Sequence, residues 1–147
     1  MVVKGTKTTF PKGAPGVRHW FLLNAKDRIL GRLATKVAGL LIGKDRPDRS
    51  PHVDEGAFVV VVGAADVVVS GAKETKKIYY RHTQRPGRLK RENLASLRAR
   101  RPEEIVRRAV KGMLPKSSNQ KERLARLKIY AGDEHPHDAQ KPQEVSL

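Results

Sequence analysis

Three stretches near the start of the chain have apolar patterns that predict a strand, a helix and a second strand. Residues 19–25, HWFLLNA, are an apolar run short enough for a buried strand. Asp27 offers a cap for a helix over residues 29–43, and this helix ends at Gly43, where a left-handed residue is usual. Its leucines and valines fall on one face and its basic residues on the other. Residues 57–64, AFVVVVGA, are β-branched without alternation, which is typical of a strand covered on both faces.

This order of strand, helix and strand indicates a βαβ unit, whose crossover is right-handed in nearly all known sheets. We therefore expect an α/β fold: a three-layer α/β/α domain with a small, mostly parallel sheet, plus basic loops and an extended N-terminal arm. The arm covers residues 1–18, where glycine and proline interrupt any apolar period. The α/β domain covers residues 19–131, and residues 132–147 form an irregular polar tail.

The middle of the chain predicts two further extended pieces and a projecting loop. VVVSG at residues 67–71 is interpreted as a short strand, and KKIYYR at residues 76–81 as another extended segment. Residues 81–91 follow as a loop, because Pro86 and Gly87 are turn residues that keep the arginines around them at the surface.

The remaining sequence predicts helices and a final strand. Pro102 suits the first position of a helix, and acidic residues follow it where the helix dipole favours them. Met113 is expected to face inward, and the helix end around Gly112 is expected to pack on the sheet, so that added bulk there would cost stability. KIYAG at residues 128–132 is interpreted as the last strand.

The net charge of the chain indicates what kind of partner it binds. The chain of 147 residues carries 31 Lys and Arg against 15 Asp and Glu, a formal net charge of +16. Such self-repulsion disfavours a compact fold unless an anionic partner neutralises it, so a polyanion is the expected partner. The chain has no cysteine and no apolar run long enough to span a membrane. Its start lacks the apolar segment of a secretory signal, and we expect a soluble, unprocessed cytoplasmic protein.

The sequence offers no convincing catalytic, cofactor or metal site. GLLIGK at residues 39–44 is one residue short of a phosphate-binding loop and places Asp45 where a metal-binding hydroxyl belongs. The HPHD segment, with His135 and His137, lacks further ligands nearby. Carboxylates are scattered rather than clustered, and no serine lies in a strained strand-to-helix turn. We expect no enzyme, no cofactor, no metal and no small-molecule substrate.

The segment 76–91 favours RNA instead. A basic run on a balanced helix usually indicates a solvated face, but this segment has no acidic residue at all. Arginines spaced by glycine and proline, with Tyr79, Tyr80 and His82 able to stack or donate hydrogen bonds, suit the phosphates and 2′-hydroxyls of folded RNA.

Several blocks of sequence also coincide with one family. They are LGRLATKVAGLLIGK, SPHVDEGAFVVVV, SGAKETKKIYYRHTQRPG, GMLPK followed by RLKIYAG, and HPHDAQKP. In order and spacing, over roughly residues 19–142, the chain resembles the bacterial form of the large-ribosomal-subunit family known as L-thirteen. It departs from the family's usual residues at Asn24, Ala57 and Gly63.

The resemblance implies an α/β structural protein of the large subunit that binds large-subunit rRNA early in assembly and touches neighbouring ribosomal proteins. It also implies possible binding to its own mRNA as a repressor. Two alternatives stay open: an RNA-processing or modifying enzyme with a basic footprint, and a free RNA-binding translational regulator. The residues expected to bind RNA lie in the arm, the loop around residues 44–52, the segment 73–91, the helical region after it and the HPHD segment: Lys4, Lys7, Arg18, Lys44, Arg46, Arg49, His52, Lys73, Lys76, Lys77, Tyr80, Arg81, His82, Thr83, Arg85, Gly87, Arg88, Lys90, Arg91, Arg100, Arg101, Arg107, Arg108, Lys111, Lys116, Lys121, Arg123, His135 and His137.

Overall fold

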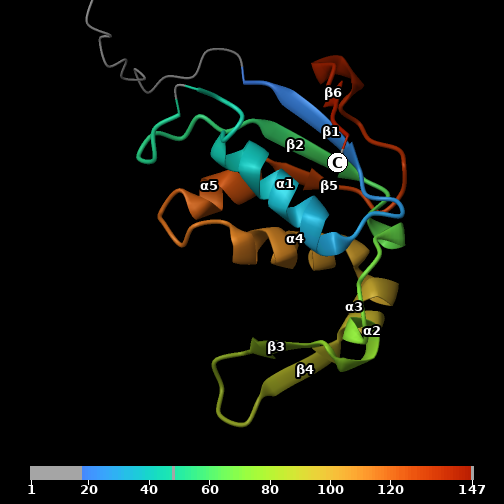
Figure 1. Ribbon diagram of the computed structural model, residues 1–147. Helices are drawn as coiled ribbons and strands as arrows, with labels where there is room; N and C mark the ends of the chain where they lie inside the picture. The colour runs from blue at the N-terminus through green and yellow to red at the C-terminus, as the bar shows by residue number, and fades with distance from the viewer. Residues whose placement is uncertain (1–17, 48, 147) are drawn as a thin grey trace, which may run out of the picture.

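A computed structural model describes residues 18–47 and 49–146 of the chain. A sheet and the helices packed on it form the body, from which a hairpin projects (Figure 1). The elements run in the order β1 (Trp20–Asn24), α1 (Leu30–Ile42), β2 (Phe58–Val62), the 3-10 helix η1 (Ala64–Asp66), α2 (Lys73–Lys76), β3 (Ile78–His82), β4 (Leu89–Asn93), α3 (Leu94–Arg100), α4 (Pro102–Met113), α5 (Gln120–Ala125), β5 (Leu127–Ile129), the 3-10 helix η2 (Asp138–Gln140) and β6 (Gln143–Glu144).

The main sheet has four strands in the order β5-β2-β1-β6, and every neighbouring pair is parallel. Strand β1 pairs with β2 along its whole length, from Trp20 opposite Phe58 to Asn24 opposite Val62. Helix α1 connects these two strands and packs against β2. The expected α/β fold with a mostly parallel sheet is confirmed.

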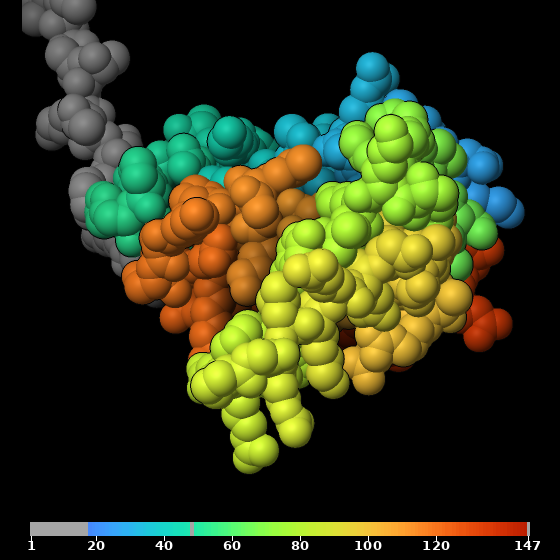
Figure 2. Space-filling model, turned by 90° about the horizontal axis from the view of Figure 1, so that it is seen from below, coloured from blue at the N-terminus to red at the C-terminus, as the bar shows by residue number. Residues whose placement is uncertain are grey.

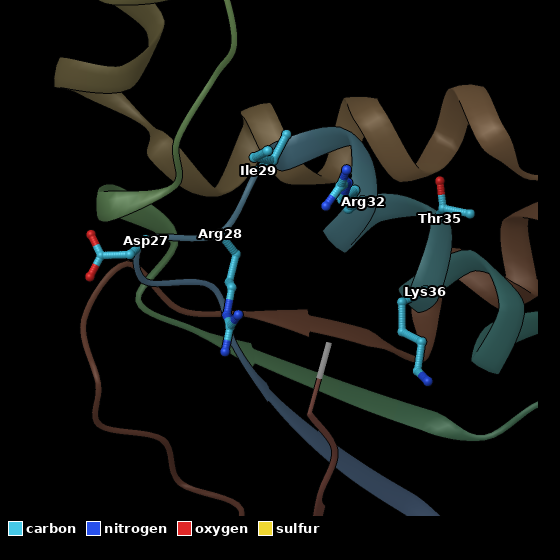
Figure 3. Close-up of a pocket in the computed structure, with 6 residues that line it drawn as sticks. All are labelled: Asp27, Arg28, Ile29, Arg32, Thr35 and Lys36. Atoms are coloured by element: carbon cyan, nitrogen blue, oxygen red, sulfur yellow. The ribbon is translucent and has the colours of Figure 1, made fainter.

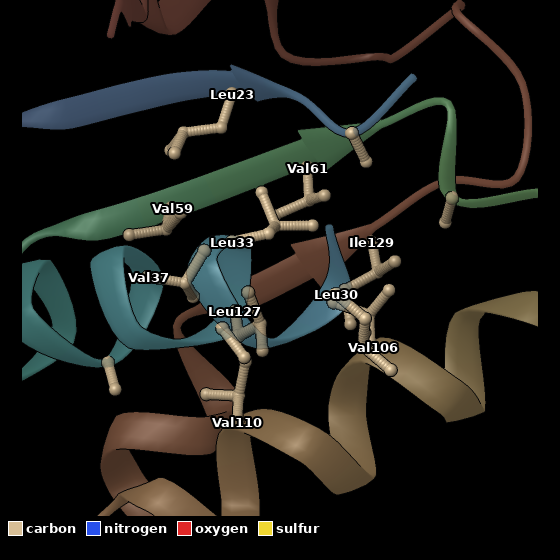
Figure 4. Packing of buried hydrophobic residues seen from close by; sticks show 14 of the residues in the cluster. Leu23, Leu30, Leu33, Val37, Val59, Val61, Val106, Val110, Leu127 and Ile129 are labelled. Atoms are coloured by element: carbon tan, nitrogen blue, oxygen red, sulfur yellow. The ribbon is translucent and has the colours of Figure 1, made fainter. Parts of the chain in front are cut away.

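One face of the sheet and two helices enclose the hydrophobic core (Figure 4). Leu23, Val59 and Leu127 belong to one cluster with the buried sides of α1 and α4, and each is at most 1% exposed. Helix α1 ends at Gly43, with φ of 80°, as predicted. Its start differs from the prediction: Ile29 holds the N-cap position without a side-chain cap, and Asp27 lies before it in a left-handed conformation, with φ of 57°.

The C-terminal segment covers part of the other face of the sheet. Side chains alternate along a strand, so Trp20 and Phe58 point away from the core cluster, and their rings stack at 4.4 Å. The ring of His137 lies 5.1 Å from that of Trp20, and its Nε2 is 2.9 Å from the hydroxyl of Tyr130. We expected an irregular tail here. It contains instead the turn η2 and the short strand β6, which pairs with β1.

Strands β3 and β4 form a separate antiparallel hairpin, and this corrects two predictions. Residues 81–91 are not all loop, because residues 89–93 form β4. Residues 67–71 are not a strand, since Val68 forms only an isolated bridge with Ile29. Strand β4, LKREN, has no apolar run to reveal it, because pairing with β3 holds it in place rather than burial.

Candidate nucleic-acid interface

The hairpin exposes a dense set of cations. All residues from Tyr80 to Arg91 are exposed, and this range contains no acidic side chain. Arg81 stands directly opposite Lys90 in the ladder, and Tyr80 stands opposite Arg91. The connecting loop turns through Gln84 and Gly87, whose φ values are 60° and 74°. Arg85 and Arg88 therefore lie in a tight turn at the tip, where their side chains point into solvent.

The base of the hairpin is fastened to the body through Tyr79. This half-buried ring packs against the core cluster, with the ammonium of Lys77 at 5.2 Å and the guanidinium of Arg108 at 5.0 Å from its centre. Burial raises the pKa of Tyr79, and the nearby charge of Glu74 adds to that effect while Arg108 opposes it. The phenol therefore stays neutral, and it links the basic hairpin to the basic face of α4.

A groove beside this base gathers cations from three helices and the turn after α2. Arg32 from α1, Lys73 from α2, Lys77 after it and Arg108 from α4 all line it. Its floor includes Met113, which is 43% exposed and accepts a hydrogen bond from the Thr35 hydroxyl at 3.4 Å. The prediction that Met113 faces inward is thus wrong, because Met113 lies on the side of α4 that lines the groove, while Val110 and Leu114 face the core.

Gly112, which also lines this groove, is exposed rather than packed on the sheet. A Cβ added there would meet no atom within 4 Å, apart from the backbone of its own helix. The expectation that bulk at this position would clash is therefore wrong, because Gly112 also lies on the open side of α4.

The start of α1 adds cations that the sequence analysis did not assign to RNA. Arg28, Arg32 and Lys36 line a depression at this helix end together with Ile29 (Figure 3). All three cations are exposed. Arg32 and Lys36 are four residues apart on one face of α1, and Arg28 lies just before the helix. This spacing of basic residues is the signal that could have identified them.

The loop after α1 is held by a buried ion cluster around Asp54. Its carboxylate accepts two hydrogen bonds from the guanidinium of Arg126, the longer at 2.7 Å, and one from Arg123 at 3.4 Å. Arg18 approaches the same carboxylate at 4.0 Å. Burial alone would raise the pKa of Asp54, but the hydrogen bonds and charges of Arg126 and Arg123 together hold it below its ordinary value.

This cluster changes the expected role of Arg123, which was assigned to RNA. Its side chain is only 4% exposed and is paired with Asp54, so the structure places it inside the body. Gly56 lies beside the same cluster, and a Cβ added there would come within 1.8 Å of the carbonyl oxygen of Leu41. The loop therefore passes α1 at a distance that only glycine permits.

Tyr80, His82, Thr83 and Gly87 belong to the exposed hairpin described above, and the remaining expected residues fall into three groups. Exposed cations without an ion pair to any described acidic residue are Lys44, Lys73, Lys76, Lys77, Arg81, Arg85, Arg88, Lys90, Arg91, Arg101, Lys111, Lys116 and Lys121. Residues that are half-buried, paired or in contact with other side chains are Arg18, Arg46, Arg49, His52, Arg100, Arg107, Arg108, His135 and His137. Lys4 and Lys7 lie outside the described residues.

The structure therefore brings the hairpin, α2, α4 and the start of α1 into one basic surface, which we call the hairpin surface: residues 73–91 with Arg32, Arg108 and Lys111. Lys44 and the loop that follows it lie at the far end of α1 (Figure 1). In Figure 2, seen from below, the hairpin stands in front of the body. Among the described residues no cluster of three or more potential metal ligands occurs, and none of their helices is long and apolar enough to cross a membrane.

Comparison with known proteins agrees with the sequence resemblance. A family model described as Ribosomal protein L13 matches residues 18–136. Large ribosomal subunit protein uL13 of Trichormus variabilis is 49% identical over 142 residues, which cover 97% of this chain and 94% of that protein. The protein of the same name from Alcanivorax borkumensis is 47% identical, with 96% of this chain and 99% of that protein covered.

Proposed function

The chain belongs to the ribosomal protein L13 family and is thus a protein of the large ribosomal subunit, and on this premise we propose that it binds large-subunit rRNA and supports early assembly of the subunit. The observation that carries the proposal is the hairpin surface, where cations from the hairpin and three helices lie together and, apart from Arg108, form no ion pair with a described acidic residue. The family is one of ribosomal proteins rather than enzymes, and we assign the chain a structural role.

The chemistry of the hairpin surface fits an RNA backbone. Arginine presents a planar fork of donors that can bind two phosphate oxygens at once, and Arg81, Arg85 and Arg88 are free to do so. A narrow two-stranded hairpin that projects from the body can reach between RNA helices, whose wide, shallow minor groove exposes phosphates and 2′-hydroxyls (Figure 1). The groove at its base would hold a second length of backbone against Arg32 and Lys73.

The ion cluster at Asp54 supports the same function indirectly. It joins the loop before β2 to Arg123 in α5 and to Arg126 just before β5, across 69 and 72 residues of chain. This junction fixes where Lys44 and the rest of the loop stand relative to the body. We propose the loop as a second contact with rRNA at the opposite end of α1.

The salt dependence of binding tests the proposal. If the surface meets on the order of six to ten phosphates, affinity for a large-subunit rRNA transcript should fall about a thousandfold or more between roughly 50 and 200 mM salt. Changing Arg81, Arg85 and Arg88 together to glutamine should reduce the slope by about three, because each contributes about one phosphate contact. Lys26→Gln, an exposed cation outside the surface, is the control and should leave the slope unchanged. A flat salt profile for the parent protein contradicts the proposal.

Sedimentation and RNA turnover separate the alternatives. A structural component should travel with large subunits through a moderate salt wash, whereas a free regulator, including one that binds its own mRNA, should remain near the top of the gradient. An RNA-processing or modifying enzyme should cut or modify labelled RNA with Mg²⁺ or common cofactors present. Turnover above a mock preparation would therefore overturn the structural role.

A further inference from the structure

The pairing register divides the hairpin into two chemically different faces. Side chains alternate across a strand, and directly opposite residues share a face. One face therefore carries Arg81 and Lys90, a purely cationic pair. The other carries three cross-strand pairs in succession: Ile78 with Asn93, Tyr80 with Arg91, and His82 with Leu89. We call this second face the tyrosine face.

The tyrosine face is apolar at its centre and open. Tyr80 is 60% exposed, and the apolar residues on either side of it, Ile78 and Leu89, are 45% and 46% exposed. The guanidinium of Arg91 lies 5.9 Å from the centre of the Tyr80 ring. Apolar side chains are exposed in all three cross-strand pairs of this face, and their exposure to water is unfavourable. The face is therefore suited to contact with a binding partner.

Neighbouring Tyr79 shows that this exposure is specific to one ring. Tyr79 points to the opposite face and packs against the core cluster, between Lys77 and Arg108. Tyr79 and Tyr80 thus have different structural environments and different roles. Tyr79 fastens the hairpin to the body, whereas Tyr80 packs on no part of the core cluster.

We propose that Tyr80 is a stacking platform for an unpaired nucleobase of the rRNA, with Ile78 and Leu89 against the neighbouring sugars and Arg91 on the adjoining phosphate. This inference rests on the proposed function and adds that the hairpin recognises an exposed base, not only duplex backbone. Proteins that recognise unpaired RNA bases combine an aromatic platform with nearby cations in this way.

Charge favours RNA over a protein as the occupant. The tyrosine face has no acidic side chain, and the acid on the opposite face, Glu92, is paired with Arg100 at 2.8 Å. The cores of protein interfaces are depleted in charged residues, whereas Arg91 stands beside the central ring here. A polyanion with planar, apolar bases matches both the cations and the exposed ring.

Three variants of the full-length chain test the platform. Tyr80→Phe keeps the ring and should bind the large-subunit rRNA transcript as the parent does. Tyr80→Leu keeps the apolar character but removes the π-face, and it should bind about tenfold more weakly, within a range of roughly 5- to 100-fold. Arg91→Gln should also weaken binding and should flatten the salt slope, which Tyr80→Leu should leave unchanged. Circular dichroism should show each variant folded, because both positions are exposed.

Crosslinking locates the base directly. Short-wavelength ultraviolet light applied to assembled large subunits should leave a nucleotide adduct on the peptide that contains Tyr80. An adduct between Tyr80 and another protein, equal binding by the parent and Tyr80→Leu, or equal loss in Tyr80→Phe and Tyr80→Leu would each overturn the platform. If the parent protein binds the transcript with a steep salt dependence but the Tyr80 tests contradict base stacking, the stacking proposal is wrong and the proposed function stands. If the parent protein does not bind the transcript, both the stacking proposal and the proposed function are wrong.

Discussion

Replacing Asp54 with asparagine is expected to destabilise the fold by about 3 to 5 kcal/mol. The carboxylate is the shared counter-ion of Arg123 and Arg126, whose side chains are only 4% and 5% exposed. Asparagine keeps the size of the side chain but removes its charge, so two buried guanidinium groups lose their partner. Loss of one partner from a buried ion pair costs this amount because the remaining charge stays desolvated. A domain of this kind holds only about 5 to 15 kcal/mol in total.

Urea unfolding followed by far-ultraviolet circular dichroism measures this cost at neutral pH. The control is Glu104→Gln, which breaks contacts to Arg107 at 4.0 Å and Arg108 at 3.5 Å. The Glu104 side chain is 35% exposed, so that variant should lose no more than about 1 kcal/mol. Equal losses in the two variants would refute the claim that burial makes the Asp54 cluster strong.

The pH dependence of folding stability distinguishes the effect of the Asp54 charge from the effect of its side-chain shape. The pKa of Asp54 is lower in the folded state than in the unfolded chain, where it is about 4, so its charge stabilises the fold above that pH. The contribution is lost as the pH falls from about 4 through the folded pKa. The stability difference between the parent and Asp54→Asn should therefore be largest at neutral pH and narrow below about pH 4. A constant difference down to about pH 3 would mean that the carboxylate's charge is not responsible.

Five further substitutions test single positions. Gly56→Ala should cost more than about 2 kcal/mol in urea unfolding, because its Cβ would overlap a carbonyl oxygen of α1. Gly112→Ala, on the open side of α4, should instead stabilise by up to about 1 kcal/mol, and a loss there would show that the groove is more tightly packed than described. Arg85→Lys and Arg88→Lys should each weaken binding to the rRNA transcript although the charge is kept, because lysine lacks the planar fork. Gly87→Val should disturb the hairpin turn and reduce binding while the melting temperature of the body changes little, since φ is 74° there.

The parallel sheet was predictable from sequence because its strand β2 is buried on both faces. Val59, Val60 and Val61 are each 0% exposed, and a continuous apolar run is the pattern that such burial requires. Strand β4 and strand β6 could not be found in this way, because both are short, polar and exposed. Each exists through hydrogen bonding to a partner strand, which is a relation between distant residues and leaves no local pattern.

The basic and exposed character of the candidate site was predictable to a similar extent. The run of cations without acids in residues 76–91 is a local feature, so the amino-acid sequence alone is enough to identify this segment as basic and exposed. The position of Arg123 was not predictable, since in sequence it resembles the exposed Lys121 two residues earlier. What separates them is Asp54, which lies 69 residues before Arg123 in the chain and contacts it only in the folded structure.

The division between internal and free cations explains how the fold accommodates a net charge of +16. Arg98, for example, donates hydrogen bonds to Glu74 and to the backbone carbonyls of Ala65 and Val67. Its charge is therefore used in contacts within the fold. The hairpin has few such internal partners, and an isolated two-stranded hairpin is marginally stable in water even without like charges facing each other, as Arg81 and Lys90 do. An anionic ligand that binds the folded hairpin removes this repulsion and stabilises it by mass action. The proposed contact with RNA should therefore stabilise the hairpin as well as use its cations.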